Sequence, residues 1–315
     1  MENLKNIAES VDKCRKIDYN NNVCLRSVRT PLNNPEDNMD STKLLELKKT
    51  AVNVRKWALT AVYKAQSGHP GGSLSLADLI TYLYFAEMKV DPKNPTDPMR
   101  DRFVLSKGHC SPAYYAALGL KGYFDVNGLE TFRQIDSIFQ GHPDMKGVPG
   151  VDMSTGSLGM GISAACGMAL AGKDQYRVYT VLGDGECQEG SVWEAAMLAA
   201  HYKLDNLVAM IDFNGLQIGG NITDVMNPTP FDKKFEAFGW HTIVIDGHNF
   251  EEIEAALNEA RTVKGKPTAI ICKTAKGKGV SYMENNYKWH GNAPKTAEYE
   301  QAMNELNAWE VSLNG

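Results

Sequence analysis

The chain has 315 residues, of which 43% are hydrophobic and 23% are charged, and its formal net charge is −5 at pH 7. This is an ordinary globular composition, and the acidic balance argues against a nucleic-acid partner, whose binding surfaces are usually basic. No apolar stretch reaches the roughly 18 residues that a membrane-spanning helix requires, and the N-terminus lacks the apolar core of a signal peptide.

Residues 1–43 differ in character from the rest of the chain. They are polar and rich in asparagine, with little periodicity, which predicts a peripheral or flexible arm. Its early acidic residues argue against a transit peptide. Residues 44–315 are predicted to form one α/β domain. It starts with an amphipathic helix over 44–65, which Ser41-Thr42 is placed to cap.

Three histidines follow in loops rich in glycine and proline. The first, His69, lies in SGHPGG, ahead of a predicted helix over 75–85. A short strand at 103–105 leads to His109 in SKGH, which precedes a predicted helix over 112–120. The third, His142, lies in QGHPD. A single histidine is more often structural than catalytic, but three in such loops are hard to explain as core packing.

The stretch STGSLGMG, residues 154–161, opens a helix of small residues, ISAACGMALAG. Its glycines and the free N–H groups of the helix start are suited to hold an anion. The small residues also permit a close contact with another helix or another chain. Both interpretations stay open.

A βαβ unit follows. The strand predicted over 176–182 ends at Gly183-Asp184-Gly185, and a helix is predicted over 189–202. The strand predicted over 207–213 ends at Asn214. Because ligands bind at the carboxyl ends of parallel strands, Asp184 and Asn214 are expected to meet there despite lying 30 positions (214 − 184) apart. Their oxygens suit Mg²⁺ or Ca²⁺ bound together with phosphate, and the glycine turn supplies N–H donors. The alternative is an ordinary βαβ unit in which GDG has no function.

The loop 215–220 is rich in glycine and is suited to turn a carbonyl toward a metal. The basic loop KTAKGKG at 273–279 indicates either a phosphate contact or a solvated surface. The six cysteines form no CxxC pair, which argues against zinc and indicates reduced thiols in a cytoplasmic protein; they are Cys14, Cys24, Cys110, Cys166, Cys187 and Cys272. The remaining predicted elements are helices at 231–238 and 250–263 and strands at 241–245 and 267–272.

Five blocks in this order resemble the diphosphate-binding half of transketolase, over about residues 44–295. They are SGHPGG, LSKGHCSPAYYAAL, STGSLGMGIS, GDGECQEGSVWEAA with IDFNGLQIGG, and WHGNAP. One GDG is weak support, whereas five ordered blocks are specific. The resemblance implies a thiamine-diphosphate-binding α/β fold, in which helices cover both faces of a mostly parallel central sheet.

The resemblance also implies roles for individual residues. Asp184 and Asn214 would bind Mg²⁺ or Ca²⁺ through their side chains, and Leu216 through its carbonyl. His69 and His290 would face the thiazolium ring and the sugar, His142 would touch the substrate, and Glu189 would lie near the dimer interface in a carboxylate network. The residues implied to contact thiamine diphosphate are His109, Gly156, Ser157, Leu158, Gly185, Asn214, Ile218 and His290.

Members of the family are about twice as long, and their second half holds the glutamate that activates the aminopyrimidine ring. This chain ends at Gly315 without a segment resembling that half. It is therefore expected to be the N-terminal subunit of a split transketolase of the pentose phosphate pathway. Its partners would be a separate C-terminal, pyrimidine-binding subunit, together with a second copy across a dimer interface and sugar phosphates. A heterotetramer is the expected assembly, and the chain alone is expected to be inactive.

Two alternatives remain. One is another thiamine-diphosphate enzyme, such as a deoxyxylulose-phosphate synthase or a transketolase that acts on an unusual ketose. The other is a non-catalytic binding or regulatory protein, which would be expected to have lost part of the metal and histidine set. A nucleotide-binding Rossmann protein is disfavoured because no GxGxxG opens the first helix after a strand.

Overall fold

The structure is a computed structural model that describes residues 39–314, which belong to one compact unit. The expectation of a polar arm falls almost wholly on residues outside this range, as do Cys14 and Cys24. None of the described helices is long and apolar enough to cross a membrane.

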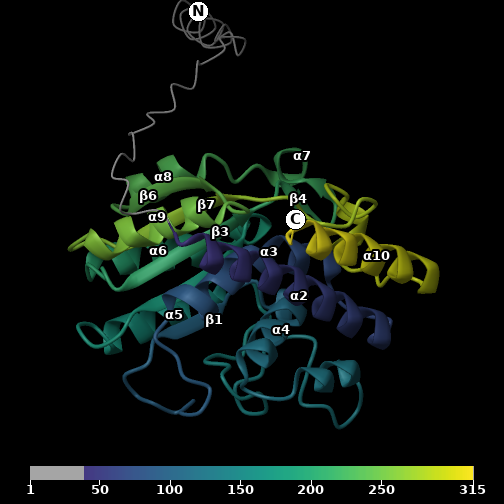
Figure 1. Ribbon diagram of the computed structural model, residues 1–315. Helices are drawn as coiled ribbons and strands as arrows, with labels where there is room; N and C mark the ends of the chain where they lie inside the picture. The colour runs from purple at the N-terminus through teal and green to yellow at the C-terminus, as the bar shows by residue number, and fades with distance from the viewer. Residues whose placement is uncertain (1–38, 315) are drawn as a thin grey trace, which may run out of the picture. The chain divides into compact units, whose positions relative to one another are not determined.

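The centre of the unit is a five-stranded, all-parallel sheet with the strand order β1-β2-β3-β7-β6 (Figure 1). Strands β2, β3 and β7 have buried β-branched and aliphatic residues along nearly their whole length, as expected for strands covered on both faces. A two-stranded antiparallel ribbon, β4 with β5, follows β3. The strands are β1 (Arg102–Leu105), β2 (Val178–Gly183), β3 (Leu207–Phe213), β4 (Leu216–Gln217), β5 (Gly220–Asn221), β6 (His241–Asp246) and β7 (Thr268–Lys273).

Helices cover both faces of the sheet. Alternate strand residues such as Val208 and Met210 pack in one core with helices α2, α3, α4 and α9, whereas Ala209 and Ile211 pack in a second core with α5, α6 and α8. The predicted α/β fold, with a parallel sheet between two layers of helices, is confirmed. The helices are α2 (Ser41–Ala65), α3 (Pro70–Tyr82), α4 (Ser111–Lys121), α5 (Met160–Ala171), α6 (Gly190–His201), α7 (Ile222–Met226), α8 (Phe231–Ala237), α9 (Phe250–Thr262) and α10 (Thr296–Ser312).

Short helical turns join these elements and place several loops of interest. A π-helical turn, Leu83–Glu87, extends α3. Turns of 3₁₀ helix lie at Gly108–Cys110, Val126–Thr131, Gly185–Gln188 and Tyr287–His290. Helix α10 packs on α2 in a third, smaller apolar cluster, which also contains Val280 and Met283.

Two helix starts differ from the sequence-based expectations by three or more residues, and a third agrees within one residue. Helix α2 begins at Ser41, and its N-cap is Asp40, whose side chain accepts a hydrogen bond from the Thr42 amide. Helix α3 begins at Pro70, inside the predicted SGHPGG loop, because proline fits the first turn, where its missing N–H costs nothing. The GDG turn leads first into the 3₁₀ turn, and α6 starts at Gly190, one residue after the predicted start.

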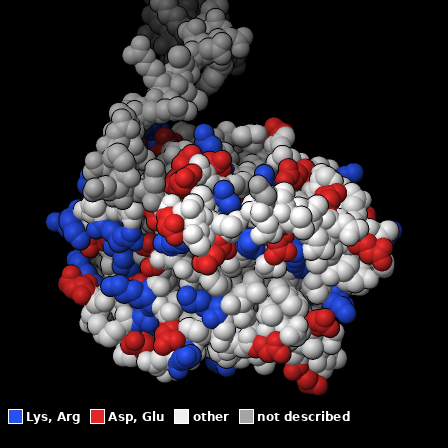
Figure 2. All heavy atoms as spheres, in the orientation of Figure 1, with Lys and Arg blue, Asp and Glu red and all other residues white. Residues whose placement is uncertain are grey.

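The face in Figure 2 carries charges of both signs, with acidic side chains among the basic ones.

Candidate active site

A cavity of about 390 Å³ opens where β2 and β3 end, and it brings together most of the residues singled out from the sequence. Of those residues, only Ser157 and His142 are absent from the lining. His142 lies directly behind it: a Cβ built on Gly156 would be 3.2 Å from the His142 ring. The predicted residues that line the cavity are His69, His109, Gly156, Leu158, Asp184, Gly185, Glu189, Asn214, Leu216, Ile218 and His290.

Asp184 and the turn that begins at Asn214 are in direct contact. The strand register pairs Gly183 with Asp212, so the two strands end side by side. One Asp184 oxygen accepts a hydrogen bond from the Gly215 amide at 2.5 Å, and the other accepts one from Gly185 at 2.7 Å. Burial and the nearby charge of Asp212 raise the pKa of Asp184 to about 6. A buried carboxylate of this kind is stabilised by a cation.

The oxygen donors here are one carboxylate, one amide side chain and the backbone of the 214–216 turn. Asn214 Oδ1 accepts a hydrogen bond from the Leu216 amide at 3.2 Å, which holds the side chain over its own turn. Among residues 39–314, no three His, Cys, Asp or Glu side chains are grouped to hold a metal ion. A cation at this edge of the sheet would therefore need the mixed set of oxygen donors that hard cations prefer.

Four histidines gather at one side of the cavity. The ring centre of His69 lies 5.2 Å from that of His109, 5.4 Å from that of His290 and 6.3 Å from that of His142. Burial, followed by the charges of Arg133, His142 and Lys276, lowers the pKa of His69 to about 4. Burial and the charge of Lys276 lower the pKa of His290 to about 3.

The same physical causes act on the other two rings. Burial and the Lys107 charge lower the pKa of His109, and burial and Arg133 lower that of His142. All four imidazoles are therefore neutral near pH 7. His69 Nδ1 is buried and has no hydrogen-bond partner in the described part of the chain, so it is free to bond a ligand.

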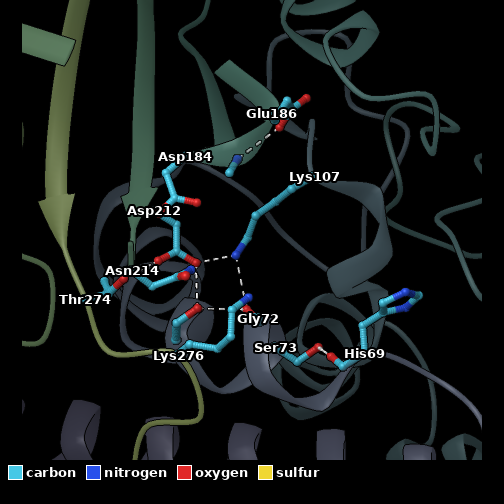
Figure 3. A network of polar contacts seen from close by, with 12 residues as sticks. His69, Gly72, Ser73, Lys107, Asp184, Glu186, Asp212, Asn214, Thr274 and Lys276 are labelled. Atoms are coloured by element: carbon cyan, nitrogen blue, oxygen red, sulfur yellow. Dashed lines mark hydrogen bonds and ion pairs between the residues drawn. The ribbon is translucent and has the colours of Figure 1, made fainter. Parts of the chain in front are cut away.

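A buried ion pair that was not anticipated from the sequence lies beneath the cavity (Figure 3). Lys107, which follows β1, bonds the carboxylate of Asp212 and donates to the Gly72 carbonyl at 3.1 Å. Ser75 and Thr274 also donate to Asp212. Burial alone would raise the pKa of Asp212, but the Lys107 charge and these hydrogen bonds outweigh it and lower that pKa. The signal was present in the sequence, because an aspartate within the apolar strand LVAMIDF must be paired when buried.

Lys276 is the second buried lysine in the wall of the cavity. It is only 2% exposed, so the interpretation of this lysine as part of a solvated surface is wrong. Its ammonium lies 3.4 Å from His290 Nδ1 and forms none of the salt bridges found among residues 39–314. Burial and the positive charge of Lys107 lower its pKa. An unpaired buried cation in the cavity wall favours an anionic ligand.

Glu186 accepts hydrogen bonds from three segments that surround the cavity, and this role was not predicted from the sequence. Its buried carboxylate accepts hydrogen bonds from Ser106 Oγ, from the Gly159 amide at 2.8 Å and from the Gly183 amide at 2.9 Å. These donors lie after β1, ahead of α5 and at the end of β2. The arrangement as a whole can bind a phosphorylated anion through N–H groups and Lys276, hold a divalent cation, and offer neutral imidazoles for proton transfer.

Comparison with known proteins gives the chain's relatives. The family model described as "Transketolase, thiamine diphosphate binding domain" matches residues 47–312. A 6-deoxy-6-sulfo-D-fructose transketolase subunit of Clostridium sp. (strain MSTE9) is 45% identical, and the match covers 84% of this chain and 98% of that protein. An apulose-4-phosphate transketolase subunit of Phocaeicola vulgatus is 44% identical, over 80% of this chain and 91% of that protein.

Longer transketolases match over part of their length. The human transketolase is 44% identical over 85% of this chain, but the match covers 43% of the human protein. Among solved structures, the transketolase of Campylobacter jejuni superposes with a TM-score of 0.77 at 35% identity, covering 87% of this chain and 46% of that one. The chain therefore spans under half of these longer relatives and nearly all of the two shorter ones.

Proposed function

The chain belongs to the transketolase family through its thiamine diphosphate-binding domain, and we propose that it is the N-terminal subunit of a split transketolase. With a separate C-terminal, pyrimidine-binding subunit it would transfer a two-carbon ketol unit from a ketose phosphate to an aldose phosphate. The observation that carries this proposal is the cavity at the ends of β2 and β3, which is lined by two buried carboxylates, two buried lysines and three neutral histidines, with His142 behind them. The match to nearly the full length of two proteins named as transketolase subunits supports the division into subunits.

The residues around the cavity fit thiamine diphosphate with a divalent cation. We assign the cation, Mg²⁺ or Ca²⁺, to the side chains of Asp184 and Asn214 and the carbonyl of Leu216, which supply only oxygen donors. Lys276 and His109 would face the diphosphate, and both already lie in the cavity wall. The exposed side chain of Ile218 at the mouth would support the organic part of the cofactor, together with Leu158.

Bound thiamine diphosphate supplies a carbon nucleophile and an electron sink. The chain's own residues would then manage protons and orient the sugar. His69, with its unpartnered Nδ1, is suited to hold a hydroxyl or alkoxide oxygen of the substrate, and His290 and His142 flank it. Neutral imidazoles can donate and accept hydrogen bonds, so these rings would hold the sugar hydroxyls and orient them for proton transfer.

We further propose that a second copy of the chain packs on the outer face of α5 and α6. Met160 and Met197 on this face are 55% and 59% exposed, and Leu170 and Leu198 lie on the same two helices. Small residues along α5 allow another helix to approach closely. Glu189, exposed at the start of α6, also lines the cavity, so a partner on this face would lie next to the site. Two copies of each subunit would form a closed heterotetramer.

The free, buried thiols of the described part of the chain suit the reducing cytoplasm, where we propose that the enzyme acts. The pentose phosphate pathway is the proposed context. A second candidate substrate class is an unusual ketose, because the two relatives matched over nearly their full length are named for sulfofructose and apulose 4-phosphate.

The test is reconstitution of the chain with the C-terminal subunit of a split transketolase. With thiamine diphosphate and Mg²⁺, the pair should transfer a ketol unit from xylulose 5-phosphate, sulfofructose or apulose 4-phosphate to an aldose phosphate, and the chain alone should not. Turnover by the homogeneous chain alone would refute the proposed division into subunits. Activity only with pyruvate plus glyceraldehyde 3-phosphate would indicate a deoxyxylulose-phosphate synthase, and cofactor binding without any turnover would indicate a regulatory protein.

A further inference from the structure

His248, a histidine that lies outside the cavity lining, links the turn after β6 to two other parts of the fold. Its Nδ1 lies 2.6 Å from an oxygen of Asp78 in α3. Asp78 is buried and paired with Arg55 of α2, through contacts of 3.0 and 2.5 Å. On the other side of the ring, Nε2 lies 2.8 Å from the backbone nitrogen of Ala275, in the loop after β7.

The two contacts assign the tautomer of the ring. A backbone amide can only donate, so Nε2 must present its lone pair to Ala275. The remaining ring proton is then on Nδ1, where it is donated to the Asp78 carboxylate. His248 is therefore a neutral ring that donates at one nitrogen and accepts at the other.

Ala275 precedes Lys276, the buried cation in the wall of the cavity. Hydrogen bonds hold the backbone of residues 274–277: the Thr274 amide donates to Phe213 O at 3.0 Å, the Gly277 amide to Gly71 O at 2.9 Å, and the Ala275 amide to His248, while the Lys276 carbonyl accepts from the Asn285 amide at 2.8 Å. The anchors at Ala275 and Gly277 flank Lys276 on both sides. Its stem lies against α3, where a Cβ built on Gly71 would be 2.9 Å from Lys276 Cγ.

We propose that His248 is a positioning residue, which fixes the Ala275 backbone to helix α3 and thereby sets where Lys276 presents its ammonium to the ligand. His248 does not line the cavity itself. It faces a separate hollow together with Asp246, Glu252 and Lys273. Its influence on the ligand therefore passes through the loop. The anchoring part stands on the contacts alone, whereas the effect on diphosphate affinity rests on the proposed function.

Two substitutions separate the two bonds of the ring. In His248→Asn, the amide nitrogen can occupy the place of Nδ1 and keep the bond to Asp78, but nothing reaches Ala275. In His248→Gln, the longer side chain can place its oxygen where Nε2 lies and accept from the Ala275 amide, while Asp78 keeps its bonds to Arg55. The matched control is His241→Asn, which changes a histidine of β6. The His241 side chain bonds Glu259 and makes no hydrogen bond to residues 273–278.

The first measurement is amide hydrogen exchange of residues 273–278 in the full chain, which reports the anchor without any ligand. Exchange in His248→Asn should be about tenfold faster, because the variant loses the hydrogen bond that protects the Ala275 amide. Exchange in His248→Gln and His241→Asn should match that of the parent chain. The second measurement is calorimetric titration with inorganic pyrophosphate and Mg²⁺. His248→Asn should bind about tenfold more weakly, and the other two variants as the parent does.

Equal exchange in the asparagine and glutamine variants, or pyrophosphate affinity that falls equally in both, would overturn the inference. A parent chain that does not bind pyrophosphate would instead count against the proposed function, and the exchange data would still decide the anchor. If His248→Asn does not fold, His248→Met takes its place, because methionine has the length of glutamine and accepts no hydrogen bond of comparable strength. Equal amide exchange of residues 273–278 in His248→Gln and His248→Met would equally contradict the proposal.

Discussion

Single side chains at the carboxyl edge of the sheet have charge states that their neighbours determine. Lys107 and Asp212 stay ionised because they face each other in the core. The His69 ring stays neutral because burial and nearby cations oppose its protonation. Burial and the charge of Asp212 raise the pKa of Asp184, and two backbone amides donate hydrogen bonds to its carboxylate. Before any ligand arrives, the site thus has one carboxylate suited to a cation and several groups suited to an anion.

The first prediction concerns Asp184→Asn. The amide keeps the shape of the side chain but removes the negative charge, so the chain should bind thiamine diphosphate with Mg²⁺ about 100-fold more weakly in a calorimetric titration. Asp232→Asn, on helix α8, removes a carboxylate whose one ion pair among residues 39–314 is a 3.9 Å contact with Lys233, and it should leave the affinity unchanged. Equal affinity for the Asp184 variant and the parent would contradict the cation assignment.

The second prediction concerns pH and His69. Its pKa is about 4 in the folded chain and 6.5 as an ordinary histidine, so the unfolded chain binds more protons between these values. Stability from this group is therefore complete above pH 6.5 and is lost as pH falls toward 4. With allowance for the partial exposure of the ring, the free energy of unfolding should fall by about 1–2 kcal/mol across this window on account of His69.

Urea unfolding of the parent chain and His69→Asn at pH 7 and pH 4.5 measures this term. The variant should lose less stability on acidification than the parent. Substitution of the exposed His201 by asparagine is the control and should retain the parent's pH dependence. Identical pH dependence in the His69 variant and the parent would show that this ring is not held neutral by its surroundings.

At the scale of elements, the start of α5 and the start of α6 are packed directly on each other. Gly159, the N-cap of α5, has φ of +79°. A Cβ built on it would lie 2.3 Å from Ser191 Oγ and 2.8 Å from Glu189 Cβ. Only glycine fits here, both for its backbone angle and for the close approach. This contact connects the loop at residues 156–159 to Glu189 at the edge of the cavity.

The third prediction follows from that contact. Gly159→Ala should lower the free energy of unfolding by about 1–3 kcal/mol, because the methyl group is crowded and the left-handed backbone is strained. Gly167→Ala lies within the same helix and its Cβ would meet nothing within 4 Å. It should raise the stability of the chain by roughly 0.5–1 kcal/mol through helix propensity. Urea unfolding of both variants measures the difference, and changes of the same sign would contradict this account of α5.

At the scale of the whole molecule, the cavity lies at the edge of the described unit and not in its centre. Its wall ends at the exposed side chains of Glu189, Leu158 and Ile218. The outer face of α5 and α6, with Met160 and Met197, adjoins this edge. A site with one open side and an apolar helix face beside it is suited to completion by other chains.

The fourth prediction concerns this face. Met197→Glu would place a charge in the proposed contact between copies, where it could be neither solvated nor paired, and should weaken self-association by about tenfold or more. Sedimentation velocity over a range of concentrations measures it. Val311→Glu, on α10, is the control, since Val311 is similarly exposed but lies on another helix. If both variants associate as the parent does, the copies meet at another surface.

The sequence by itself determined the family, the alternation of strands and helices, and the convergence of GDG with Asn214, because these follow from local patterns: apolar runs, glycine turns and the ordered motif blocks. It placed the strand ends within one or two residues. It also predicted His69, His109 and His142 in loops; His142 lies outside the helices and strands, whereas His69 is the N-cap of α3 and His109 lies in a 3₁₀ turn.

Only the tertiary structure decided how the buried charges are paired. Lys107 meets Asp212 from 105 positions away, and His248 meets Asp78 from 170 positions away. Such contacts depend on which helix covers which face of the sheet, and no local pattern contains that information. The burial of Lys276 has the same origin. Its loop is basic and rich in glycine, as a solvated loop would be. In the folded chain, contacts with β3 and α3 hold this loop in the wall of the cavity.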